Sequence, residues 1–168
     1  MKVADTDLGL HAMKLLCLED DLCPDGMVLE SAFNNFTEIV RHIPIAQIYY
    51  RVFPQDWVDM LLIHPARTHL NVHLNSDENI LHVHAPILML HAEDDLIVPV
   101  SLAYKLFEMA KSRPGGQYSH FAKFPAGQGY KHCHIWKSPA LLPLFRKFLN
   151  DIVRSPKPVS DTVYELLS

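Results

Sequence analysis

The run ILMLHA at residues 87–92 constrains the fold more than any other stretch of the chain. It is almost wholly apolar, and it is followed at once by three acids, Glu93, Asp94 and Asp95. A short apolar run without alternation is typical of a strand that is buried on both faces, as in a parallel sheet. We therefore predict a buried strand within residues 85–93 whose carboxyl end presents acidic side chains.

The rest of the chain alternates between strand and helix patterns. Prolines at positions 44 and 54 break the segment 31–74 into short helices, because proline removes a backbone donor and clashes with the preceding turn. The alternation predicts an α/β fold with a parallel sheet flanked by helices. The patterns predict further strands at 27–30 and 119–125, and helices at 8–18, 75–83, 100–111 and 137–153.

Side chains near two of the predicted helix starts are of the types that cap helices. Ser76 is expected to cap the helix at 75–83. Ser138 is expected to cap the helix at 137–153, with Pro139 at its first position. The domain is predicted to span residues 1–153, with a cap-like helical insertion at about 34–74 and a tail at 154–168. Ordinary helical packing explains the insertion equally well.

Composition excludes several classes of protein. A chain of 168 residues is long enough for one domain and too short for two, and its net charge of −4 with scattered basic residues argues against nucleic-acid binding. The longest apolar runs fall short of the ~18 residues that a membrane span needs, and the first residues lack the apolar core of a signal peptide. The odd count of cysteines indicates reduced thiols: Cys17, Cys23 and Cys133.

The histidines raise the question of a metal site. Three close pairs occur, but none joins a second cluster in a recognised metal-binding pattern, so neither a metal nor a cofactor is expected. The pairs are His69 with His73, His82 with His84, and His132 with His134.

Polar residues follow each predicted strand. Glu30 closes the first strand, the three acids at 93–95 follow the second, and a loop containing His132 and His134 follows the third. Right-handed crossovers bring the carboxyl ends of parallel strands to one edge, where ligands bind in open sheets. Glycines at 127 and 129 allow that loop to turn sharply. An acid and a histidine in this order can form a catalytic pair, in which the carboxylate orients the imidazole that acts as base.

Two of these stretches resemble the α/β-hydrolase family. HAEDDLIVP resembles the end of the acid-bearing strand, which assigns the acid to Asp95, and GYKHCHIWKSP resembles the histidine loop, which assigns the base to His132. Together with VLESAFNNF, they resemble the membrane-anchored α/β-hydrolase-domain lipases over roughly residues 8–153. The resemblance implies hydrolysis of lysophosphatidylserine and monoacylglycerols, and the C-terminal portion of the α/β-hydrolase fold.

The nucleophile of such an enzyme is missing from the sequence. A serine hydrolase carries its serine in a G-x-S-x-G turn, and none of the 168 residues forms that pattern. The turn is expected upstream of the helix at 8–18, together with the early strands and the membrane anchor, which leaves strand 27–30 at an exposed edge. Ser31 lacks a flanking glycine for a strained turn, and Cys133 adjoins His132 in a loop, so neither is expected to replace the serine.

Two functional hypotheses follow. In the first, the parent protein is a serine lipase of the endoplasmic reticulum membrane with a lipid substrate, which contacts the membrane through the upstream part. In the second, the chain is a catalytically inactive truncated isoform or fragment that acts at most as a binding or interaction module.

Overall fold

A computed structural model describes residues 2–5, 24–69 and 75–154, and a four-stranded parallel sheet lies at the centre of these residues. The strand order is β1-β2-β3-β4, which is also the order along the chain. Met27 lies in register with Ile87, and Ala92 lies in register with Phe124. The strands are β1 (Lys2–Asp5), β2 (Met27–Glu30), β3 (Ile87–Ala92) and β4 (His120–Phe124).

Helices cover both faces of the sheet, which explains the unbroken apolar runs in its central strands. Met27, Leu29 and Met89 point to one face and pack with α6 (Ser76–Ile80) and α7 (Val100–Ser112). Val28, Leu88 and Leu90 point to the other face, where the buried Phe148 of α8 (Leu141–Arg154) covers them. Two short 3-10 helices, Gly116–Tyr118 and Ile135–Lys137, lie in the connections on either side of β4.

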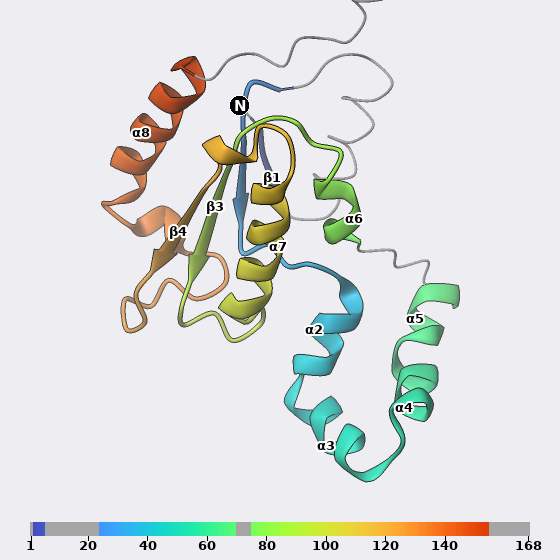
Figure 1. Cartoon of the computed structure of the whole chain (residues 1–168). Coiled ribbons are helices and arrows are strands. Elements are labelled where there is room, and N and C mark those ends of the chain that lie inside the picture. Colours follow the sequence, from blue (N-terminus) through green and yellow to red (C-terminus); the bar gives the residue numbers. More distant parts are fainter. Residues whose placement is uncertain (1, 6–23, 70–74, 155–168) are drawn as a thin grey trace, which may run out of the picture.

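All strands end at the same edge of the sheet, where Figure 1 shows the loops that follow β3 and β4. We call this edge, formed by residues 30–31, 93–98 and 125–138, the carboxyl rim. Beyond it extends a group of short helices, which we call the helical lobe (residues 36–69) (Figure 1). The lobe consists of α2 (Phe36–His42), α3 (Pro44–Val52), α4 (Gln55–Leu62) and α5 (His64–His69).

The structure has one strand more than the three that the sequence predicts. β1 pairs with β2 along its whole length, from Lys2 beside Met27 to Asp5 beside Glu30. β2 is therefore not the exposed edge that the sequence predicts, because it has a partner on each side. The strands predicted at 27–30, 85–93 and 119–125 are confirmed, the last two with shorter ends.

The expected helix caps are wrong. Asn75, and not Ser76, precedes the first residue of α6, while Ser76 lies inside that helix and is buried. Ser138 follows a 3-10 helix, and α8 begins at Leu141, so Pro139 lies in a turn before the helix. The predicted helix at 8–18 and most of the predicted tail lie outside the described residues.

The proline-broken segment is confirmed as short helices. α3 begins at Pro44 and α4 directly after Pro54, where a missing backbone donor costs nothing. Whether this insertion serves as a cap stays a prediction. Within the described ranges, none of the helices is both long and apolar enough to cross a membrane.

Candidate active site

Asp95 and His132, which come from loops after different strands, meet at the carboxyl rim. Nδ1 of His132 lies 2.9 Å from Oδ2 of Asp95. The side chain of Asp95 is fully buried, whereas one third of the His132 side chain is exposed. The structure thus brings together the two residues that the sequence assigns as acid and base, with the imidazole accessible to a ligand and the carboxylate shielded from water.

The second carboxylate oxygen of Asp95 is held by the backbone of its own loop. Oδ1 accepts hydrogen bonds from the N–H groups of Ile97, at 2.9 Å, and Val98, at 3.0 Å. Burial alone raises the pKa of Asp95, but the hydrogen bonds from Val98, His132 and Ile97 outweigh it and hold the pKa below its ordinary value. Asp95 is therefore ionised at neutral pH and fixed in the orientation that faces His132.

A second histidine, which sequence reasoning did not single out, lies beneath this pair. His91 is fully buried in β3, and its Nε2 lies 2.9 Å from the carbonyl oxygen of Val98 and 3.6 Å from Oδ2 of Asp95. Burial lowers the pKa of His91, so the ring is neutral at pH 7 and its Nε2–H donates to the Val98 carbonyl. The signal in the sequence is a lone histidine inside an apolar strand.

The other two acids of the cluster fasten the histidine loop. Oε2 of Glu93 accepts the N–H of Ala126 at 3.1 Å, while its Oε1 pairs with Lys123 at 2.6 Å. Oδ1 of Asp94 accepts the N–H of Lys131 at 3.0 Å. Asp94 thus binds the backbone directly next to His132, and Glu93 binds the start of the same loop.

Ser31 contacts the same loop from the end of β2. Its Oγ donates to the backbone carbonyl of His132 at 2.8 Å, and its N–H donates to the carbonyl of Leu90 at 2.9 Å. Its φ of 52° lies in the left-handed region, so the backbone adopts a strained turn without the glycine that the sequence argument requires. The buried hydroxyl is directed at the His132 backbone and not at its ring, which supports a structural role for Ser31.

Glu30, the last residue of β2, is a further acid of the rim. Burial raises the pKa of Glu30, and the hydrogen bond from the N–H of Ile135 and the nearby rings of His132 and His134 partly offset this effect. One carboxylate oxygen, Oε1, is buried without a hydrogen-bond partner. The net effect raises the pKa of Glu30, so this carboxyl group ionises less readily than that of an exposed glutamate.

The histidine loop turns where the glycines predict. Gly127 has a φ of 88° and Gly129 a φ of 72°. A Cβ at either position would meet nothing within 4 Å, so the backbone conformation, and not lack of space, favours glycine there.

The remaining candidates do not join the Asp95–His132 pair. Cys133 is an exposed free thiol, and Nδ1 of His134 is buried without a partner. His82 and His84 are exposed in the connection before β3, outside any strand. The side chain of His69 and the whole of His73 lie outside the description. In the described ranges, no three His, Cys, Asp or Glu side chains come together in a way that could hold a metal ion.

Several curated proteins similar to this chain in sequence are named as lysophosphatidylserine lipases. Lysophosphatidylserine lipase ABHD12 of Danio rerio is 33% identical over 91% of the chain, and that of Macaca fascicularis is 37% identical over 86%. Protein ABHD12B of Homo sapiens is 32% identical over 86% of the chain. The chain spans only 35–38% of the length of these relatives. No family model matches the chain.

Solved structures with a similar fold are hydrolases and a peroxidase. A meta-cleavage product hydrolase from Pseudomonas fluorescens matches 89% of the chain and 64% of its own length, with a TM-score of 0.53 and 19% identity. An acylaminoacyl peptidase from Pyrococcus horikoshii matches 97% of the chain and 25% of its own length, with a TM-score of 0.54 and 16% identity. A putative non-heme bromoperoxidase from Mycobacterium tuberculosis matches 89% and 66%, with a TM-score of 0.52 and 15% identity. The chain therefore has the C-terminal portion of an α/β-hydrolase fold and is a homologue of the lysophosphatidylserine lipases.

Proposed function

We propose that Asp95 and His132 are the acid and base of a serine hydrolase that cleaves the acyl ester of lysophospholipids, such as lysophosphatidylserine, and of monoacylglycerols. The observation that carries this proposal is the 2.9 Å contact between Oδ2 of Asp95 and Nδ1 of His132, made by a buried carboxylate whose other oxygen binds two backbone N–H groups. The printed names of the curated relatives support the choice of substrate.

Each member of the pair has a defined task in this reaction. Asp95 accepts the Nδ1–H of His132, which fixes the tautomer and leaves Nε2 free to act as a base. His132 removes the proton from the nucleophilic serine as that oxygen attacks the ester carbonyl, and the imidazolium that forms is stabilised by Asp95. His132 then gives the proton to the leaving glycerol oxygen, and in the second half of the cycle it activates the water that releases the fatty acid.

The reaction also requires a serine in a strained turn and donors for the oxyanion. The printed sequence contains no G-x-S-x-G. We place these groups, with an anchor in the endoplasmic reticulum membrane, on a further segment of a longer protein. β1 pairs with β2 on the side of the sheet where a nucleophile strand is expected.

A fluorophosphonate probe tests this assignment in two steps. The 168-residue chain should not be labelled, because the probe reacts only with an activated serine. A form extended through a G-x-S-x-G turn should be labelled and should release fatty acid from lysophosphatidylserine, and His132→Gln should abolish both. Labelling of the 168-residue chain that Ser31→Ala removes would instead identify Ser31 as the nucleophile.

The absence of that turn from the sequence also favours a second candidate, an inactive isoform or fragment that acts as a binding or interaction module. The readout that separates the two is lysophosphatidylserine binding without turnover. If the extended form binds this lipid and neither reacts with the probe nor releases fatty acid, the binding module is the better description.

A further inference from the structure

A histidine lies near the end of β3, at a place where the packing of the sheet alone would favour an apolar side chain. His91 is fully buried, and it points to the same face as Met89, because alternate residues of a strand share a face. Its Nδ1 is buried without a hydrogen-bond partner. A buried polar atom without a partner destabilises a fold, and proteins keep such groups mainly where a function requires them. The contacts of the other ring nitrogen, Nε2, indicate that function.

The side chains of His91 and Asp95 hold the same residue, Val98, from its two ends. Oδ1 of Asp95 accepts the N–H of Val98 at 3.0 Å, and Nε2–H of His91 donates to the carbonyl oxygen of Val98 at 2.9 Å. Val98 itself is buried, and it is followed by Pro99, whose ring fixes the next φ. The loop that carries Asp95 is thus fastened to β3 by the imidazole of His91.

The same imidazole faces the carboxylate of Asp95. Nε2 of His91 lies 3.6 Å from Oδ2 of Asp95, which is the oxygen that contacts Nδ1 of His132 at 2.9 Å. A separation of 3.6 Å is too long for a hydrogen bond, so the direct effect of His91 on this oxygen is electrostatic. Because Nε2 carries the proton, its N–H dipole lies beside the buried carboxylate and favours the ionised form. Oδ2 therefore lies between two imidazoles, one buried and one accessible.

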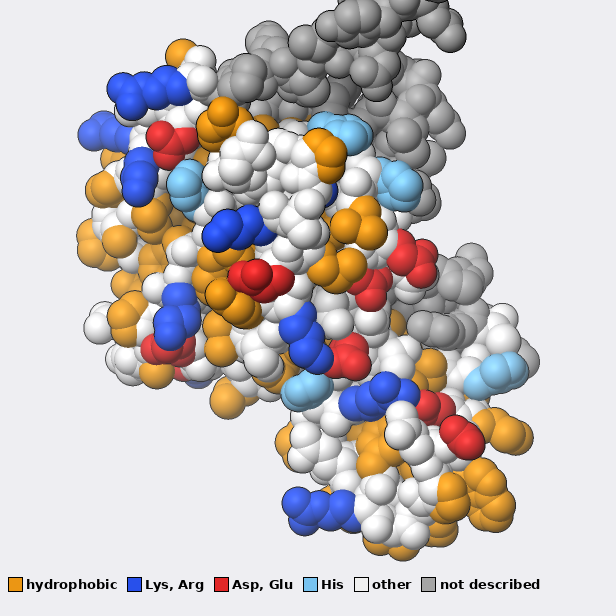
Figure 2. Space-filling model, viewed as in Figure 1, with side chains coloured by type: hydrophobic (Ala, Val, Ile, Leu, Met, Phe, Trp, Pro, Cys, Tyr) orange, Lys and Arg blue, Asp and Glu red, His pale blue; other side chains and the backbone are white. Residues whose placement is uncertain are grey.

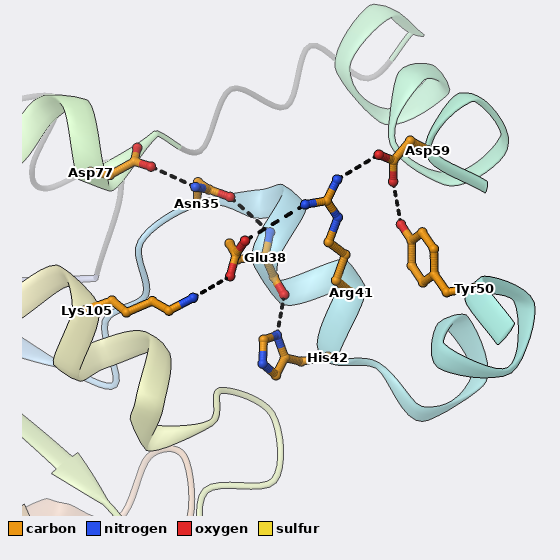
Figure 3. Close-up of polar contacts among 8 residues, drawn as sticks. All are labelled: Asn35, Glu38, Arg41, His42, Tyr50, Asp59, Asp77 and Lys105. Carbon is orange, nitrogen blue, oxygen red and sulfur yellow. Dashed lines mark hydrogen bonds and ion pairs between the residues drawn. The ribbon is translucent and has the colours of Figure 1, made fainter. Parts of the chain in front are cut away.

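Acidic side chains elsewhere in the molecule are stabilised in a different way. Figure 2 shows acidic and basic side chains spread over the surface, several of them next to each other. In the helical lobe, Asp59 lies between the guanidinium of Arg41 at 2.7 Å and the hydroxyl of Tyr50 at 2.6 Å (Figure 3). Asp95, in contrast, is the only Asp or Glu among the described residues that is buried, and no Lys or Arg among them forms an ion pair with it. N–H groups stabilise its charge instead, and one of these belongs to the residue that His91 holds.

We propose that His91 is a positioning residue for Asp95: it fixes Val98, whose N–H binds Oδ1, and so directs Oδ2 toward His132. The inference rests on the proposed function, in which Asp95 orients the base, and His91 acts through Asp95. Burial lowers the pKa of His91 and keeps the ring neutral. A neutral ring is required for this role, because an imidazolium in the same place would compete with His132 for Oδ2. If His91 only filled the core, its loss would lower stability and leave the carboxylate of Asp95 unchanged.

NMR spectra of the 168-residue chain test the starting point without any substitution. Long-range ¹H–¹⁵N spectra of the imidazoles at pH 7 should show His91 in the neutral form with its proton on Nε2. The Nδ1–H of His132 should give a ring-proton signal that its bond to Asp95 shifts downfield. A His91 ring that is charged at pH 7, or that carries its proton on Nδ1, would overturn the inference, because the contact with Val98 and the neutral charge are both part of it.

Two variants of the 168-residue chain separate positioning from packing. His91→Gln keeps an N–H that can reach the Val98 carbonyl, whereas His91→Leu fills the space without a donor. In His91→Leu, the carboxyl carbon of Asp95 should titrate at a higher pH than in the parent, and the downfield signal of His132 should weaken. His91→Gln should stay closer to the parent in both measurements.

Two controls match these variants. Leu88→Ala, at a buried residue of the same strand, controls for lost stability. Tyr50→Phe removes a donor from the carboxylate of Asp59 in the helical lobe (Figure 3). Neither should change the titration of Asp95 or the signal of His132. Circular dichroism establishes that each variant is folded, and His91→Asn, whose amide is too short to reach the Val98 carbonyl, replaces His91→Leu if the latter does not fold.

Turnover by the form extended through a G-x-S-x-G turn gives a second readout. His91→Leu should lower kcat for lysophosphatidylserine by about 10- to 100-fold with little change in KM, because a misplacement of about 1 Å in the reacting groups can cost about 10²-fold. His91→Gln should recover most of this loss.

The outcomes distinguish this inference from the proposed function. If Asp95 titrates in His91→Leu as it does in the parent, or if Leu88→Ala has the same effect, His91 is a packing residue and the inference is wrong. If the extended form is inactive while the titration of Asp95 responds to His91 as expected, the proposed reaction is rejected and the positioning of Asp95 is retained.

Discussion

The carboxyl rim and the helical lobe differ in what they leave exposed. In the rim, polar side chains turn inward and bind backbone groups, as Asp94 does with the N–H of Lys131 and Ser31 with the carbonyl of His132. In the lobe, polar side chains bind one another, and the apolar ones face outward. Both described non-glycine residues with positive φ, Ser31 and Lys131, lie in the rim.

The rim therefore holds its side chains in fixed positions, whereas the lobe presents an apolar surface. In the rim, side chains fix the backbone, so Asp95 and His132 can be held in one arrangement. Strained backbone conformations such as those of Ser31 and Lys131 persist only where many surrounding contacts hold them in place. An apolar exterior like that of the lobe is typical of a surface that a partner covers. Substitutions in the rim should therefore change the rate of the proposed reaction, and substitutions on the outer face of the lobe should change binding to a partner.

The largest effect should come from the pair itself. In the extended enzyme, His132→Gln removes the proposed base and Asp95→Asn leaves the wrong tautomer, so each should lower kcat for lysophosphatidylserine by about 10⁴-fold. Turnover at saturating substrate measures this directly. His134→Gln is the matched control, because no contact joins His134 to Asp95 among the described residues, and it should stay near the parent activity. The reverse pattern would assign the base to His134.

The next effect compares one substitution in two regions. Leu29 of β2 is fully buried, whereas Leu61 of α4 is 66% exposed. Leu29→Ala should lower the free energy of unfolding by about 2–5 kcal/mol, because it removes buried methyl groups and leaves a cavity. Leu61→Ala should change it by less than about 0.5 kcal/mol. Urea denaturation measures both, and a comparable loss at Leu61 would mean that the outer face of the lobe is covered within the chain.

Strong local patterns explain which parts of the fold the sequence predicts. The strand at 87–92 and the helix at 100–112 are recovered because an unbroken apolar run and an amphipathic period each specify one structure. β1 was not predicted, because four residues of mixed polarity carry no such pattern and become a strand by pairing with β2. The prediction that Ser76 caps a helix was wrong because α6 already begins at Ser76, which places Asn75 at the cap position.

In the site, the sequence could assign partners only where a family motif identified them. The resemblance predicted that Asp95 would face His132, and the distance agrees, while their catalytic roles stay a prediction. The contact of Asp94 with the Lys131 backbone depends on how two loops pack, whereas the position of His91 beneath Asp95 depends on how the loop after β3 folds back on its own strand. Residues 37 or more positions apart in the chain make several of these contacts, and no local pattern encodes them.

Two carboxyl groups of the rim, those of Asp95 and Glu30, should contribute to the free energy of unfolding with opposite dependence on pH. The pKa of Asp95 is lowered in the folded chain, so its contribution is present above its unfolded pKa of about 3.9 and is lost as the pH falls through the folded value. Asp95→Asn should therefore cost most at neutral pH and little in acid. Urea midpoints between pH 3 and pH 8 measure this, and a cost that does not depend on pH would mean that Asp95 is not ionised in the fold.

The pKa of Glu30 is raised above its ordinary value of 4.5, chiefly by burial. Its favourable contribution is present below the unfolded pKa and is lost as the pH rises through the folded value. Glu30→Gln removes that loss and keeps an oxygen that can accept the N–H of Ile135. The variant should gain stability relative to the parent as the pH rises from 4 to 7, and a relative loss over that range would contradict the direction of the shift.

The smallest effect separates strain from hydrogen bonding at Ser31. Ser31→Ala keeps the left-handed backbone and loses the bond to the His132 carbonyl, so it should cost about 1 kcal/mol. Ser31→Gly loses the same bond, but it relieves about 1–2 kcal/mol of backbone strain against an entropic cost of about 0.5–1 kcal/mol. Glycine should therefore be the less damaging replacement, although alanine is the closer one in shape. Thermal melts of the two variants measure the difference. If the glycine variant is the less stable of the two, the positive φ of Ser31 stores no strain. Backbone strain at Ser31 would then no longer distinguish the rim from the lobe.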